Sequence, residues 1–151
     1  MEGSGGGAVF LGTHEPRLDE KGRLVLPAKF REELASGVVL TKGQDRSIIV
    51  WPTAAFTAYS ERLSEASRSD ARVRGIQRVL FSGAFDEIPD RQGRITVPGP
   101  LREYAGLDRD VVVVGNGTTC EIWDSAAWQG YLASQDDAFS GLSEEVVPGI
   151  L

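Results

Sequence analysis

The chain has 151 residues, of which 41% are hydrophobic and 25% charged, and its formal net charge is −6. These fractions are typical of a soluble globular protein, and no apolar run approaches the roughly 20 residues of a membrane span. One cysteine, Cys120, excludes an intrachain disulfide and fits a reducing cytoplasm, while one histidine, His14, leaves too few ligands for a Cys/His zinc site. We therefore expect no cofactor, no metal and no membrane partner, and we find no signal-peptide pattern at the start of the chain.

The predicted elements of the first half follow a glycine-rich start at residues 1–8, which we interpret as a flexible extension or a cloning remnant, with Val9 as the native initiator. Pro27 opens a helix that Gly37 ends, and Pro52 opens the next helix. In chain order we expect a strand at residues 9–14, a turn at 19–22, a strand at 23–26 and a helix at 27–36. A hairpin of strands 38–41 and 47–51 follows, and then helices at 52–63 and 71–82.

The second half repeats this order. Ser125 is positioned to cap its last helix, and the acidic stretch after it, which contains Pro and Gly, is expected to be mobile. We expect a strand at residues 85–88, a turn at 90–93, a strand at 94–97 and a helix at 98–104. A hairpin of strands 111–114 and 120–123 follows, then a helix at 126–133 and a tail at 135–151.

The two halves also repeat in sequence. The motif from Asp19 to Pro27 reappears from Asp90 to Pro98, and Trp51-Pro-Thr-Ala-Ala-Phe resembles Trp123-Asp-Ser-Ala-Ala-Trp. A repeat of this length indicates a duplicated domain, and a unit of about 70 residues buries so thin a core that we expect oligomerisation. The predicted domains and their connections are residues 9–63 for the first, 64–83 for a linker helix region, 84–134 for the second and 135–151 for the acidic tail.

The charge is divided unevenly between these halves. Residues 1–83 contain 12 Lys and Arg against 10 Asp and Glu, whereas residues 84–151 contain 4 against 12. This asymmetry predicts different partners, because a basic half suits phosphates and an acidic half suits solvent or protein surfaces. Drift on a solvated surface is the alternative explanation. Within the basic half, the arginines between residues 68 and 78 fit either a solvated helix face or a secondary DNA or subunit contact.

In each copy an aspartate precedes an arginine by four residues, across a turn that contains glycine. Asp19 and Arg23 form the first pair, and Asp90 and Arg94 the second. A carboxylate and a guanidinium at this spacing can pair within the turn or across protomers, so we expect Asp19, Asp90 and Arg94 to serve turn structure and assembly. A purely structural staple in each turn is the alternative.

The sequence Leu18-Asp-Glu-Lys-Gly-Arg-Leu-Val-Leu-Pro-Ala-Lys-Phe-Arg31 resembles the swapped-hairpin fold of AbrB-like transcription factors. The duplication resembles the MraZ family, from residue 9 to residue 131, as do four further segments: Phe10–His14, Thr41–Arg46, Gln77–Gly83 and Glu121–Asp124. The resemblance implies an α+β, mainly β fold, with tandem AbrB-like (SpoVT-AbrB) swapped-hairpin β-barrel domains and flanking helices that assemble into a ring.

The resemblance further implies a bacterial transcriptional regulator of the division and cell-wall gene cluster. Such a regulator binds G-rich direct repeats of double-stranded DNA in its own promoter, and usually represses it, as a ring-shaped homo-oligomer, an octamer or a dodecamer. The expected location is the cytoplasm, in association with the nucleoid. No small-molecule substrate is implied.

The resemblance assigns DNA contacts to Lys21 and Arg23, with Arg17, Lys29 and Arg31 as supporting residues. The chemistry of residues 17–31 agrees, because arginine can bind guanine in the major groove and lysine can contact phosphates. A ring that presents such a cluster repeatedly to repeated sites would raise a weak affinity through effective concentration.

The second copy departs from this pattern. Gln92 stands where the first copy has Lys21, and Arg91 stands where it has Glu20, so we predict that the second copy serves assembly more than DNA binding. Two other functions fit the sequence less well: an antitoxin-like AbrB protein, which is usually single-copy, and an oligomeric scaffold that does not bind DNA. An enzyme is the weakest alternative, because the sequence has no nucleophile–base pair and a single histidine.

Overall fold

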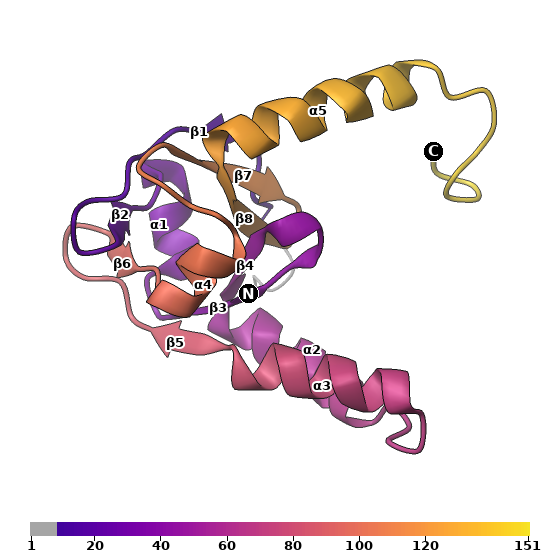
Figure 1. Ribbon diagram of the computed structural model, residues 1–151, viewed down its shortest axis with the longest axis horizontal. Coiled ribbons are helices and arrows are strands. Elements are labelled where there is room, and N and C mark those ends of the chain that lie inside the picture. The colour runs from indigo at the N-terminus through magenta and orange to yellow at the C-terminus, as the bar shows by residue number, and fades with distance from the viewer. Residues whose placement is uncertain (1–8) are drawn as a thin grey trace.

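The computed structural model describes residues 9–151, so the expected N-terminal extension at residues 1–8 lies outside the described residues. The protein is a mixed α/β structure, drawn in Figure 1. Its strands are β1 (Thr13–His14), β2 (Arg23–Val25), β3 (Val38–Lys42), β4 (Ile48–Pro52), β5 (Phe85–Glu87), β6 (Arg94–Thr96), β7 (Val111–Asn116) and β8 (Thr119–Asp124). Its helices are α1 (Ala28–Leu34), α2 (Thr53–Ser64), α3 (Ala71–Ser82), α4 (Gly99–Tyr104) and α5 (Ser125–Ser140), and a short 3-10 turn spans Gln44–Arg46.

The two copies exchange strands within one antiparallel sheet of six strands, in the order β1-β7-β8-β4-β3-β5. The first strand of each copy pairs with the hairpin of the other: β1 pairs with β7, and β5 pairs with β3. The hairpins β3–β4 and β7–β8 meet at the centre, where Val50 pairs with Cys120 and Ile48 with Ile122. Each copy therefore depends on the other for part of its sheet.

A second, two-stranded sheet also joins the copies. β2 and β6 pair antiparallel, with Leu24 opposite Ile95. Both side chains are 1% exposed and belong to a core that contains residues of both copies, including Phe30 and Leu34 on α1 and Leu101 on α4. The spacing of four between Phe30 and Leu34 places both on the inner face of α1, which explains why so short a helix forms there.

The helices that follow the two hairpins extend from the sheet as separate arms, as Figure 1 shows. In the first arm, the buried side chain of Gln77 on α3 donates a hydrogen bond of 2.9 Å to the carbonyl of Leu63 and so holds α3 against α2. Trp51 packs on Phe56 and Tyr59 at the base of this arm. The corresponding Trp123 packs on Trp128 and Tyr131 of α5, as expected for core or interface anchors. None of the helices in residues 9–151 has both the length and the apolar character required to cross a bilayer.

Both hairpins, the turns and the linking helix at residues 71–82 agree with the sequence-based expectations. Two expectations about the last helix were wrong. Asp124, not Ser125, caps α5, because its carboxylate accepts a 3.0 Å hydrogen bond from the amide of Ala127 and a negative charge is favoured at a helix N-terminus. The helix also continues to Ser140 instead of ending at Ala133.

The first strand is shorter than expected. Residues 9–14 form only β1 and an isolated bridge between Phe10 and Gly117. Swapped-hairpin barrels, ring formation, the domain boundaries and the mobility of the acidic segment beyond α5 stay predictions.

Candidate nucleic-acid interface

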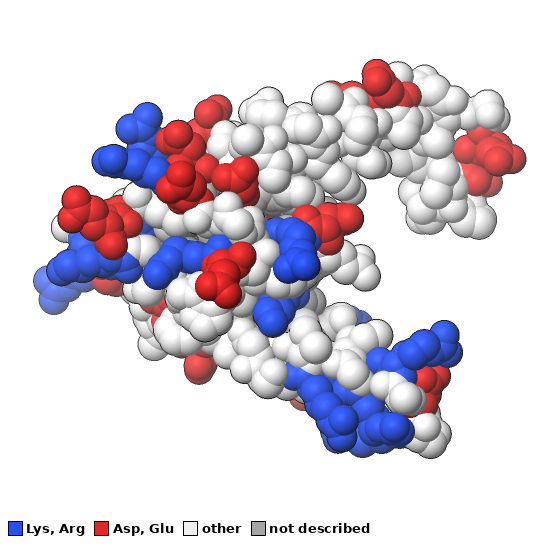
Figure 2. Space-filling view, in the orientation of Figure 1, with Lys and Arg blue, Asp and Glu red and all other residues white. Residues whose placement is uncertain are grey.

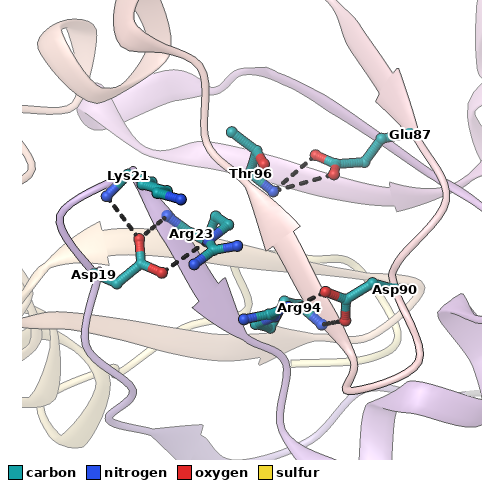
Figure 3. A network of polar contacts seen from close by, with 7 residues as sticks. All are labelled: Asp19, Lys21, Arg23, Glu87, Asp90, Arg94 and Thr96. Carbon is teal, nitrogen blue, oxygen red and sulfur yellow. Dashed lines mark hydrogen bonds and ion pairs between the residues drawn. The ribbon is translucent and has the colours of Figure 1, made fainter.

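The Asp19 and Asp90 carboxylates each organise one turn in the same way (Figure 3). One oxygen of Asp19 accepts from the backbone amides of Lys21 and Arg23 at 2.8 and 2.9 Å, and the other accepts from Nε of Arg23 at 2.8 Å. Asp90 makes the matching contacts with Gln92 and Arg94, the last at 2.7 Å. The predicted pairing within each turn is therefore present in both copies.

Glycine completes each turn, because Gly22 and Gly93 have φ values of +78° and +76°, in the left-handed region. The hydrogen bonds also stabilise the ionised carboxylates. Those from the backbone and side chain of Arg23 lower the pKa of Asp19, and those from Arg94 lower the pKa of Asp90. Both aspartates thus stay charged and hold their arginines throughout the neutral pH range.

The arginines keep their outer ends available for a ligand. Arg23 and Arg94 bond the aspartates through Nε, and within residues 9–151 neither pair of terminal nitrogens has a hydrogen-bond partner. An Nε anchor fixes the direction of the guanidinium, which leaves two parallel N–H donors for a planar acceptor. Guanine O6 and N7 in the major groove, or two oxygens of a phosphate, fit such a fork.

Both arginines lie on the same side of the β2–β6 ribbon. Arg23 is opposite Thr96 and Val25 is opposite Arg94, while Leu24 and Ile95 between them point into the core. Because side chains alternate along a strand, the four flanking side chains share the outer face. The major groove of DNA is wide enough for a two-stranded ribbon of this kind.

The pKa of Glu87 is raised, mainly by burial, although its carboxylate accepts the backbone amide of Thr96 at 2.9 and 3.1 Å. This contact ties β5 to the ribbon (Figure 3).

The remaining predicted DNA residues fall into two groups. Lys21 and Lys29 are exposed, on the first turn and on α1. Arg17 instead pairs with Asp110 at 3.1 Å, and Nε of Arg31 donates to the carbonyl of Leu26 at 3.0 Å. The structure therefore brings Lys21 and Arg23 together on one turn and gives Arg17 and Arg31 contacts within the protein.

The sequence-based site did not anticipate the arrangement of three residues around the ribbon. It assigned Arg94 to turn structure and assembly, a role that stays a prediction, and the pairing of β2 with β6 puts Arg94 on the face that carries Arg23. It also omitted Thr96 and Arg102. The repeat could have identified Arg102, because Arg102 is the counterpart of Arg31. Figure 2 shows basic and acidic side chains interleaved over the ribbon end of the molecule, and a more purely basic group near the tip of the α2–α3 arm.

Comparison with known proteins assigns the chain to a family. The family model described as "MraZ protein, putative antitoxin-like" matches twice, over residues 9–79 and 80–147. A protein of Micrococcus luteus named Transcriptional regulator MraZ is 58% identical over 142 residues, which cover 94% of this chain and 99% of the relative. Proteins of the same name from Frankia alni and Salinispora tropica are 58% and 55% identical, and the matched regions cover 95% and 94% of this chain and all of each relative. With the internal repeat and the paired turns, these matches show that the chain belongs to the MraZ family.

Proposed function

We propose that the protein is a sequence-specific DNA-binding transcriptional regulator that acts as a homo-oligomeric ring. The observation that carries this proposal is the β2–β6 ribbon, whose outer face holds two aspartate-anchored arginines with terminal donors that no residue in 9–151 occupies. The names of the relatives support the regulatory role. The proposed target is a set of G-rich direct repeats in the promoter of the division and cell-wall gene cluster to which the gene itself belongs, with repression as the usual outcome.

Within the ribbon, we assign the leading contacts to the first copy. Arg23 would bind guanine, and Lys21 beside it would contact a phosphate, which adds a salt-dependent contribution. Arg94 shares the outer face, but its neighbour Gln92 lacks the charge of Lys21. We therefore attribute the different roles of Arg23 and Arg94 to their neighbouring residues, because both arginines lie on the same outer face of the ribbon.

One turn of this size provides only a few contacts, so the proposed affinity depends on assembly. Several ribbons on one ring would engage consecutive repeats, which raises affinity through effective concentration. The repeats must return to the same face of the duplex, so their spacing should be about 10 base pairs.

The two arms offer a surface for this assembly. They border a cleft of about 980 Å³ whose lining includes Trp51, Trp123 and the exposed side chains Ile76 and Val79 on α3. Residues 125–151 contain four acidic residues and no Lys or Arg, whereas α3 contains three arginines, of which Arg72 lines the cleft. We assign the acidic C-terminal segment of a second copy as the occupant, since a head-to-tail contact between unlike surfaces can close into a ring.

Charge reversal tests this contact. Arg72→Glu on α3, at the edge of the cleft, should weaken the oligomer, Glu144→Lys in the C-terminal segment should do likewise, and a mixture of the two variants should restore assembly, as measured by light scattering. If Arg72→Glu leaves the oligomer intact and weakens DNA binding instead, the arm contacts DNA and the assembly surface lies elsewhere.

The DNA proposal is tested by fluorescence anisotropy with the DNA upstream of the protein's own gene and a scrambled control, at two salt concentrations. Arg23→Ala should lose about 1–3 kcal/mol per contact, a loss multiplied by the number of engaged subunits. Arg94→Ala is the matched control from the second copy. Equal defects in the two variants, with assembly intact, would refute the division of roles, and no specific binding by the wild-type oligomer would favour a scaffold.

A further inference from the structure

Two arginines with corresponding positions in the repeat lie against the turns of the opposite copies. Arg102 on α4 donates from Nη1 to the carbonyl of Val97, and its guanidinium lies so close to Gly22 that a Cβ there would overlap it. Arg31 on α1 donates from Nε to the carbonyl of Leu26, and a Cβ on Gly93 would lie 2.6 Å from that Nε. The second copy thus contacts the first turn, and the first copy contacts the second.

The carbonyls that the two arginines bind belong to residues that are already bonded to those turns. The amide of Val97 donates to the carbonyl of Gly22 at 2.8 Å, and the amide of Leu26 donates to the carbonyl of Gly93 at 2.8 Å. Each arginine therefore holds the residue that donates this backbone hydrogen bond and also covers the glycine that accepts it.

We infer that Arg102 is a positioning residue for the first DNA-binding turn, and that Arg31 does the same for the second turn. The inference rests on the proposed function only where it is tested by DNA binding. The second copy then contributes to DNA binding through Arg102 on α4, which holds the Gly22 turn in place and with it the Asp19–Arg23 pair. Arg31, expected from the sequence to support DNA contacts, acts instead on the opposite turn.

The surroundings of Arg102 favour this role over a phosphate contact. It lines a depression beside the first turn together with one further arginine, Arg109, and three carboxylates, those of Asp19, Glu20 and Asp108, so the carboxylates outnumber the arginines by one and disfavour a phosphate there. A planar guanidinium can donate to a carbonyl while its flat face covers a Cα, which an ammonium group cannot do. Lysine in place of Arg102 therefore keeps the charge and loses the packing on Gly22.

Amide hydrogen exchange on the DNA-free protein tests the bracing directly. Arg102→Ala should raise the exchange rate of the Val97 amide about tenfold or more and leave the Leu26 amide unchanged, because local opening follows the loss of local contacts. Arg31→Ala is the matched control and should give the opposite pattern. A rise at both amides, or at neither, would overturn the assignment of each arginine to one turn.

DNA binding separates positioning from direct contact. Arg102→Ala should lower affinity for the promoter repeats about tenfold for each engaged subunit, comparable to losing one base contact per subunit, while the slope of log affinity against log salt stays that of the wild type. Arg102→Lys should show the same loss, since charge is not what matters here. A slope smaller by about one for each engaged subunit, or full rescue by lysine, would show a phosphate contact and refute positioning.

The two readouts also distinguish the inference from the proposed function. If the exchange pattern is as expected and wild-type protein binds no DNA, the braces are real and the proposed function fails. If wild-type protein binds its repeats and Arg102→Ala binds equally well at every salt concentration, the inference fails. Far-UV circular dichroism and the unfolding midpoint of each variant establish that it is folded, and Arg102→Gln serves as the milder variant if alanine prevents folding.

Discussion

Replacing Leu24 by alanine should destabilise both copies together, because its side chain lies at the centre of the ribbon that joins them. Leu24 is 1% exposed and directly opposite Ile95 of the second copy. A buried leucine truncated to alanine costs about 2–5 kcal/mol, according to how far the site collapses. In a domain of this size, each kcal/mol lowers the melting temperature by about 2–4 °C, so a loss of about 3 kcal/mol corresponds to roughly 6–12 °C.

Tryptophan fluorescence can follow each copy separately. Trp51 belongs to the first copy, whereas Trp123 and Trp128 belong to the second, so variants with phenylalanine at one set or the other report on single copies. In urea titrations at one fixed protomer concentration, Leu24→Ala should shift the midpoints of both reporters equally. The fixed concentration is needed because assembly stabilises the folded chain by mass action.

The surface variant Leu11→Ala provides the control, since Leu11 is 59% exposed and its truncation should change stability by less than about 0.5 kcal/mol. The double variant with Ile95→Ala should be non-additive by about 0.5–3 kcal/mol, because the two side chains are direct neighbours. Two separate unfolding transitions, or a shift confined to the Trp51 reporter, would refute the view that the copies fold as one unit.

Three further predictions concern titratable groups. Because the pKa values of Asp19 and Asp90 are lowered from 3.8, their contribution to stability is present above pH 3.8 and is lost as the pH falls through the folded values. Urea midpoints of the Asp19→Asn, Asp90→Asn double variant should therefore fall less steeply in that acid range than those of wild type. The pKa of Glu87 is raised, so wild type loses part of its stability as the pH rises above 4.5 and this carboxyl ionises. Glu87→Gln lacks that loss and should become more stable relative to wild type over the same range. A difference in urea midpoints that does not change with pH would contradict this. Burial raises the pKa of Cys120 to about 12, so iodoacetamide at pH 8 should modify it only after unfolding, as measured by mass spectrometry.

The sequence predicted local elements well because their signals are local. The turn at Asp19 and Gly22, the two hairpins and the limits of the helix at residues 71–82 follow from capping residues, glycine and apolar spacing. It did not predict which strands pair. β1, β2, β5 and β6 have only two or three residues each, and alternation over so short a run cannot indicate a partner more than 40 residues away.

The end of α5 was missed for a different reason. The mostly polar residues from Gln135 to Ser140 lack an apolar periodicity and resemble a tail, but a helix that has already formed gains one hydrogen bond for each residue that extends it. Ordered packing of Trp128 and Tyr131 on Trp123 secures the first turns and allows the rest to continue.

In the candidate site, the motif identified the anchored pairs but not their surroundings. The spacing of Asp19 and Arg23 was enough to predict their contact, because both lie on one turn. The shared outer face of Arg23 and Arg94, and the placement of Arg102 against Gly22, depend on the pairing of β2 with β6 across the copies. Side chains that act through such long-range pairing leave no local spacing pattern, and only the repeat related Arg102 to Arg31.

The duplication has a consequence for the kind of DNA site that the proposed regulator would read. A homodimer with a ribbon of two identical strands presents identical ends and matches a palindrome, because operator symmetry follows protein symmetry. Here the ribbon ends differ: Glu20 and Lys21 on one turn stand where Arg91 and Gln92 stand on the other. A covalent repeat permits this divergence, since each copy can change alone while the shared core holds both turns in register. A ribbon with unlike ends has a direction along the duplex, so subunits that follow one another head to tail around a ring would meet sites that all point the same way. Direct repeats, as proposed for the operator, would therefore suit a ribbon with unlike ends better than inverted repeats would.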